Sequence, residues 1–114
     1  MANTFTKSTK SSLLTADVTA SATTNIITAG STATLILLSV LISNKTGSSA
    51  NGNVCLVPGS GDSVFLLKNA PVPAGSSLEM IQGSKIIMTA NDVLRASADT
   101  ASALDITISY LLQN

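Results

Sequence analysis

The sequence predicts an all-β fold, a single-domain antiparallel β-sandwich of about eight short strands with jelly-roll or immunoglobulin-like topology and an extended N-terminal arm. Short runs rich in Val, Ile, Leu and Thr recur along the chain, and Gly, Pro and Asn separate them at the spacing of sandwich strands. No stretch argues convincingly for the apolar periodicity of a helix. The 114 residues, 45% of them hydrophobic, suffice for one domain with its own core.

The N-terminal residues 1–17 are expected to form the arm, and residues 18–114 the sandwich domain. This first stretch is rich in Ser, Thr and Lys. Its isolated apolar residues are Phe5, Leu13 and Leu14. Because they are too few for a core and too many for a pure linker, the stretch is typical of an edge strand or of an arm that lies across a neighbouring chain. The three apolar residues would then anchor it, and an arm that is disordered in the isolated protein is the alternative.

The strongest strand is expected at about residues 33–43. Regular alternation would place its apolar side chains on both faces, with Leu35, Leu37 and Leu41 on one side and Ile36, Leu38, Val40 and Ile42 on the other. A two-layer domain buries only one face of each sheet, so a neighbouring subunit is the simplest cover for the second face. We therefore expect Leu38 and Val40 to contact a partner.

Seven further strands are expected, at residues 25–28, 53–57, 64–67, 77–81, 85–88, 93–98 and 104–110. Asn51-Gly52 is expected to form a turn that makes residues 53–57 the hairpin partner of the strongest strand. Pro71 and Pro73 are expected to form a connector between strands, because each proline removes a backbone donor. The last strand alternates most regularly. Its core face is Leu104, Ile106, Ile108 and Tyr110.

The residues that carry most enzyme chemistry are missing. There is no histidine, which removes the commonest general base and the usual zinc ligand. Cys55 is the only cysteine, so an intrachain disulfide is excluded, and we expect Cys55 to be a small buried strand residue. The acids are expected to be turn-forming or solvated, and they are Asp17, Asp62, Glu79, Asp92, Asp99 and Asp105. The sequence therefore predicts no catalytic, cofactor or metal site, and a protein that is not an enzyme.

The low content of charged residues limits the classes of partner that the sequence predicts. Only 11% of the residues are charged and the formal net charge is zero, so neither nucleic acid nor a membrane surface is an expected partner. A chain with so few charges tends to associate, which favours a homo-oligomer. The polar N-terminus lacks the pattern of a secretory signal, and we expect synthesis and assembly in a cytoplasm. The longest apolar run is about nine residues, too short for a membrane-spanning helix.

Three segments of the second half carry a resemblance to a known group of proteins. They are residues 72–79 (Val-Pro-Ala-Gly-Ser-Ser-Leu-Glu), 90–98 (Ala-Asn-Asp-Val-Leu-Arg-Ala-Ser-Ala) and 103–110 (Ala-Leu-Asp-Ile-Thr-Ile-Ser-Tyr). From about residue 30 to its last residue, the chain resembles small virion structural proteins of tailed bacteriophages. It has Asn91-Asp92 where many of these have Gly-Asp. The resemblance implies a β-sandwich subunit of a capsid or tail without an active site.

The expected function is therefore that of a non-enzymatic phage virion protein. We expect a capsid decoration or cement protein on the outer capsid surface that forms a homo-oligomer, a trimer, and bridges major capsid subunits. The first alternative is a tail, neck or fibre-base component of the virion. The second is an adhesion β-sandwich that binds a glycan, although the chain has only three aromatic residues and no tryptophan for a sugar to stack on.

Overall fold

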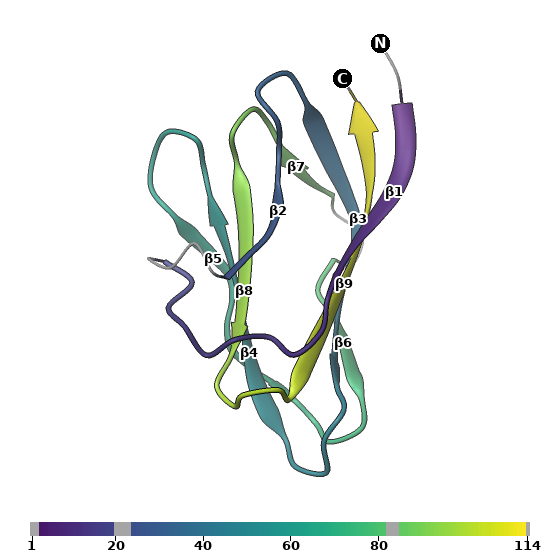
Figure 1. Cartoon of the computed structure of the whole chain (residues 1–114), viewed down its shortest axis with the longest axis vertical. Coiled ribbons are helices and arrows are strands. Elements are labelled where there is room, and N and C mark those ends of the chain that lie inside the picture. Colours follow the sequence, from purple (N-terminus) through teal and green to yellow (C-terminus); the bar gives the residue numbers. More distant parts are fainter. Residues whose placement is uncertain (1–2, 20–23, 82–84, 114) are drawn as a thin grey trace.

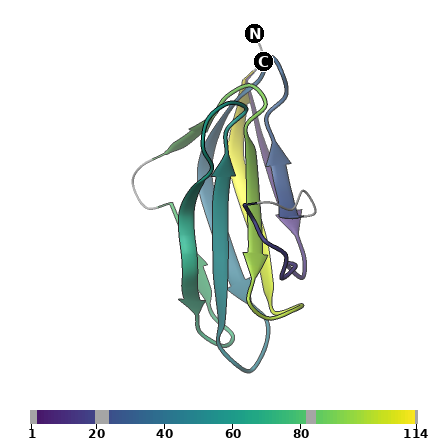
Figure 2. The same ribbon diagram turned by 90° about the vertical axis from the view of Figure 1, so that its left-hand side faces the viewer.

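The computed structural model describes residues 3–19, 24–81 and 85–113. Within these ranges the chain forms nine antiparallel strands in two sheets and no α-helix, which confirms the predicted all-β sandwich. Figure 1 views the sandwich along the gap between the sheets. Figure 2 views it from the side of the sheet formed by the strands at residues 25–28, 50–57, 64–72 and 93–98. The strands are β1 (Asn3–Lys10), β2 (Asn25–Thr28), β3 (Thr34–Asn44), β4 (Ala50–Val57), β5 (Val64–Val72), β6 (Ser77–Glu79), β7 (Ile86–Met88), β8 (Val93–Ala98) and β9 (Leu104–Gln113).

The strand order is that of a jelly roll. Sheet A has the order β1-β9-β3-β6, with β7 also paired with β3, and sheet B has the order β2-β8-β4-β5. Since β6 and β7 pair with different parts of β3, they occupy one strand position. Counted this way, the chain changes sheet at every connection except the β4–β5 hairpin, and its first and last strands are neighbours. An immunoglobulin fold would instead pair the first two strands within one sheet.

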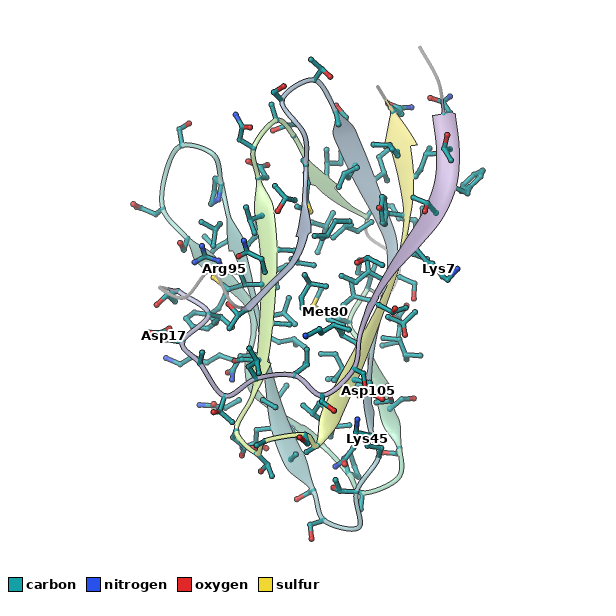
Figure 3. The ribbon with its side chains drawn as sticks, in the orientation of Figure 1. Lys7, Asp17, Lys45, Met80, Arg95 and Asp105 are labelled. Carbon is teal, nitrogen blue, oxygen red and sulfur yellow. The ribbon has the colours of Figure 1, made fainter. Side chains whose placement is uncertain are left out.

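The core fills the space between the two inner faces. Sheet A contributes Ile106 and Ile108 of β9, and sheet B contributes Val54 of β4 and Leu94 of β8, all essentially without exposure. Met80 follows β6 and points into the same space (Figure 3). The regular alternation predicted for the last strand is confirmed, because its even-numbered residues face this core.

Strand β3 departs from regular alternation through a β-bulge. Leu37 pairs with Tyr110, and Ser39 pairs with Ser109, so Leu38 is an extra residue between them. The buried residues of β3 are Leu35, Leu37, Val40, Ile42 and Asn44. The expectation that Val40 faces away from Leu37 is therefore wrong: the bulge turns every residue after position 38 by one face. The remaining apolar residues Ile36, Leu38 and Leu41 are not buried.

Glu79 supports the bulge from the neighbouring strand position. The backbone N–H of Val40 donates to Oε2 of Glu79 at 3.1 Å, and the N–H of Met80 donates to the carbonyl of Val40 at 2.8 Å. Here β6 ends, and β7 begins only at Ile86. The carboxylate thus supplies an acceptor where the strand ladder is interrupted. Glu79, expected within a strand at residues 77–81 but as a turn-forming or solvated acid, lies at the end of β6 and has a structural role.

The N-terminal segment belongs to the domain. β1 pairs with β9 along its whole length, as the purple and yellow strands show in Figure 1. Residues 11–19, here called the strap, then cross to sheet B. The N–H of Leu13 donates to the carbonyl of Leu104 at 2.8 Å, and the N–H of Ala98 donates to the carbonyl of Leu14 at 2.9 Å. Of the two expectations for this segment, the edge strand is therefore present as β1. Residues 11–19 are a strap of their own chain and not a continuing arm, and residue 17, the expected boundary, lies within the strap.

Two local expectations about turns and connectors fail. The first fails because β3 and β4, which are neighbours in sequence, lie in different sheets. Gly52 lies inside β4, and β4 pairs with β8 and β5, so it is not the hairpin partner of β3. A Cβ at Gly52 would lie 3.2 Å from Cδ1 of Leu104, a tight contact that Leu104 would have to relieve by a shift of a few tenths of an ångström. Pro71 lies inside β5, which is longer than expected. The proline is tolerated because β5 is an edge strand.

Candidate interaction surface

Four apolar side chains form a row across the outer face of sheet A. Phe5 is opposite Leu111, Leu111 is opposite Ile36, and Ile36 is opposite Ile87. At about 4.8 Å between strands, this outer row crosses about 14 Å of the sheet. Phe5 is 77% exposed and Ile87 is 59% exposed, whereas Ile36 and Leu111 are half-buried. None of the four packs against the core between the sheets.

An open depression adjoins the row where β3 bulges. Its volume is about 410 Å³, and its lining residues are Phe5, Thr6, Lys7, Leu38, Ser109 and Tyr110. Leu38, the extra residue of the bulge, does not pack against the core. Lys7 points away from the sandwich (Figure 3). The bulge thus extends the apolar surface beyond the outer row.

The structure separates the five residues predicted to bind a partner. Phe5 and Leu38 both line the depression. Leu14 is 42% exposed but lies on the strap. Leu13 and Val40 are buried in the core of their own chain, so their assignment to a partner surface is wrong for this fold. Leu13 is buried because the strap carries it between the sheets, and Val40 because of the bulge.

Sequence reasoning assigned only Phe5 of the outer row to a partner and missed three members. Ile36 was placed on an apolar face of the strongest strand without being assigned a contact. Leu111 lies beyond the expected end of the last strand, and Ile87 was expected only as a strand residue. Their alignment with Phe5 and Ile36 depends on the pairing of four strands that are far apart in sequence. The sequence of β7 is Ile-Ile-Met, apolar throughout, so no local signal identifies Ile87 as the residue that faces outward.

The outer face of sheet B differs because the chain covers part of it. Arg95 of β8 donates from Nη1 to the carbonyl of Val18 in the strap at 3.3 Å and from Nε to Oδ1 of Asn25 at 2.7 Å. Val18 and Cys55 are buried without belonging to the core cluster. Burial raises the pKa of the Cys55 thiol, which keeps it protonated and unreactive at neutral pH. Cys55 is thus a buried strand residue, as expected.

Asp105 holds the start of the strap against β9. Its Oδ1 accepts hydrogen bonds from the backbone N–H of Ser12 at 2.8 Å and from Nζ of Lys45 at 2.9 Å. Figure 3 shows Lys45 and Asp105 close together at one end of the sandwich. Ser12 has a φ of 59°, a left-handed conformation that the Asp105 contact stabilises. The hydrogen bond from Ser12 and the contact with Lys45 lower the pKa of Asp105, which marks a structural carboxylate.

Asp92 joins two loops at one end of sheet B. Its Oδ2 accepts from the N–H of Thr89 at 2.9 Å, and its Oδ1 accepts from the N–H of Gly59 at 2.9 Å. Asn91 has a φ of 67°, so the turn expected at Asn91-Asp92 is present. The two backbone hydrogen bonds lower the pKa of Asp92. This acid therefore forms a turn, as expected, and also ties the β4–β5 loop to the β7–β8 loop.

Asp92→Ala is expected to reduce the free energy of unfolding at pH 7 by about 1–2 kcal/mol, because two hydrogen bonds to a partly exposed carboxylate are lost. Since the pKa of Asp92 is lowered on folding, its contribution is complete above the ordinary pKa of 3.8 and disappears as the pH falls below that value. Urea unfolding should therefore show a larger difference from the native protein at pH 7 than near pH 2. Asp62→Ala, at an exposed loop position, is the control and should change neither value.

The described residues offer little chemistry. Among them, no group of three or more His, Cys, Asp or Glu side chains could hold a metal ion. In the same ranges, no helix has the length and hydrophobicity to cross a membrane. The acid side chains discussed above accept hydrogen bonds from backbone N–H groups of other segments, and Asp105 also contacts Lys45. The surface that stands out is the outer face of sheet A.

The sequence matches no protein-family model, and it is similar to no curated protein. The resemblance to phage virion proteins therefore rests on the three segments quoted above.

Proposed function

We propose that this chain is a non-enzymatic structural protein of a tailed-phage virion that self-associates and decorates the outer capsid surface. The observation that carries the proposal is the outer row, which leaves Phe5 and Ile87 largely in water. Jelly rolls are common among viral capsid and lectin domains, which is an argument by analogy of fold. The phage origin rests on the sequence resemblance.

The proposed mechanism is the burial of apolar surface in many identical contacts. Burial contributes roughly 25 cal/mol per Å² of apolar surface, so a modest contact repeated over a shell adds substantially to its resistance to pressure. Only 11% of the residues are charged, so these contacts depend weakly on salt. Bridging of major capsid subunits would use the same kind of surface.

The protein's copy number in purified particles tests the location. Quantitative mass spectrometry of particles should find hundreds of copies for a shell protein, whereas a dozen or fewer would indicate the tail, neck or fibre-base alternative. Absence from particles would contradict both. Sedimentation of the purified protein tests self-association and the trimer expected from the sequence.

The glycan-binding alternative has a separate test. Phe65 is the exposed aromatic residue of sheet B, but Nζ of Lys68 lies 5.1 Å from the centre of its ring and occupies one of its faces. We therefore expect no binding on a broad glycan array. Binding that Asn51→Ala or Asp62→Ala abolishes would favour the adhesion function over the virion function.

A further inference from the structure

We infer that the outer face of sheet A is the self-association interface and that its occupant is the same face of a second copy, packed around a two-fold axis through the outer row. This inference rests on the self-association in the proposed function, but it does not require a virion. It replaces a general expectation of oligomerisation with a defined surface.

The size of the face fits a stable dimer. Strand β3 has 11 residues, which at about 3.3 Å per residue span about 36 Å. Four strand positions at about 4.8 Å give a width of about 19 Å, so the face measures about 700 Å². A standard protein interface buries about 800 Å² on each partner. One outer face of sheet A is therefore close to the required area.

The chemistry of the face fits a second copy better than a charged partner. Around the outer row, near the start of β3 and the end of β9, the central strands carry apolar and hydroxyl side chains: Ile36, Leu38, Ser39, Ser109 and Leu111. The charged residues of the face lie away from the row or at its margins. Lys7 is on the edge strand β1 and Lys85 just before β7, and both are exposed. Glu79 ends β6, and Asp105, near the start of β9, is paired with Lys45. Lysines at a margin keep their ammonium groups in water when the centre is buried. An apolar centre with a polar rim is the anatomy of a homodimer interface.

The shape of the surface selects a two-fold axis. The four side chains of the outer row come from four adjacent strand positions, so they belong to the broad surface of the sheet. A two-fold axis that passes through the row and runs parallel to the strands lays the whole face on its own copy, which makes the contact self-complementary. A three-fold axis would bury only one margin of each face. The geometry therefore favours a pair over the trimer expected from the sequence.

Sedimentation of substituted proteins tests the interface. Phe5→Ser removes the most exposed member of the row and should raise the dimer dissociation constant by at least about 30-fold, the effect of truncating an aromatic residue that dominates binding. Phe65→Ser is the matched control, because Phe65 is an exposed phenylalanine on sheet B, and it should leave the constant unchanged. Circular dichroism should show that both variants remain folded. Equal effects of the two substitutions would overturn the inference.

Cross-linking tests the two-fold axis. Facing sheets lie about 10 Å apart, beyond the Cα separation that a disulfide spans, so a short bismaleimide is the suitable linker. Ser109→Cys places a thiol beside the row, and the native Cys55 is buried. This variant should give covalent dimers, whereas Ser63→Cys, exposed in the β4–β5 loop, should not. Equal yields from the two variants would contradict the face-to-face pair.

The outcomes separate this inference from the proposed function. A native protein that sediments as a monomer at 100 μM, or as a trimer that Phe5→Ser leaves intact, overturns the inference. If the monomer is nevertheless found in particles and Phe5→Ser prevents its incorporation, the face binds a capsid protein: the virion function then stands and the pair does not. A dimer that Phe5→Ser dissociates, from a protein absent from particles, supports the inference and removes the virion function.

Discussion

Val40→Asp is expected to unfold the protein, whereas Leu38→Asp is expected to leave it folded. The two positions are two residues apart on one strand, so regular alternation would give them the same environment. The bulge separates them: Val40 is 0% exposed in the core, and Leu38 lies beside the open depression. An unpaired carboxylate at position 40 would cost about 4 kcal/mol or more, a large share of the 5–15 kcal/mol that stabilises a typical domain.

Circular dichroism and thermal unfolding of the two variants provide the measurement. Leu38→Asp should retain the β-sheet spectrum and a cooperative transition, and it should also weaken self-association because it places a charge beside the outer row. Val40→Asp should lose the transition or be recovered only as aggregate. Two variants with the same stability would show that the bulge is absent.

Leu13→Ala is expected to lower the free energy of unfolding by about 2–5 kcal/mol, and Leu14→Ala by less than about 0.5 kcal/mol. Leu13 is 1% exposed and belongs to the core cluster, so its truncation leaves a cavity between the sheets. Leu14 is 42% exposed and does not belong to the core cluster, and its contribution to the fold is a backbone carbonyl that alanine retains. The contrast distinguishes a strap built into the domain from an arm that binds elsewhere.

Urea denaturation followed by circular dichroism measures both values. For a domain of about this size, a loss of 1 kcal/mol lowers the melting temperature by roughly 4 °C, so Leu13→Ala should melt at least about 8 °C below the native protein. The m-value should stay constant, because the surface exposed on unfolding hardly changes. If both substitutions had equally small effects on the free energy of unfolding, residues 11–19 would be an arm that is separate from the domain.

Most strands could be predicted from the sequence, because local patterns specify them. The alternation of the last strand depends on side chains that point to opposite faces every second residue, and β2 and β8 begin and end at the expected residues. The proline-containing part of β5 could not be predicted, since a proline is compatible with an edge strand and incompatible with a central one. Which of these applies depends on the strand order.

The candidate surface was only partly predictable. Phe5 and Leu38 were expected to contact a partner, and the structure brings them together in one depression. Leu13 and Val40 were placed wrongly, because an isolated leucine in a polar segment and an apolar strand residue look alike whether they face a core or a partner. A bulge has no reliable local signature, yet it decides which residues after it face inward.

The sequence by itself determined that this is an all-β chain with a core of its own and without histidine chemistry, because alternation, turn residues and composition are local properties. The tertiary structure decided the rest. Jelly-roll order, the pairing of β1 with β9 and the alignment of the outer row all depend on contacts between strands that are far apart in the chain. One extra residue at Leu38 then exchanged core and surface along the strongest strand, because side chains alternate with a period of two and any insertion reverses every face that follows.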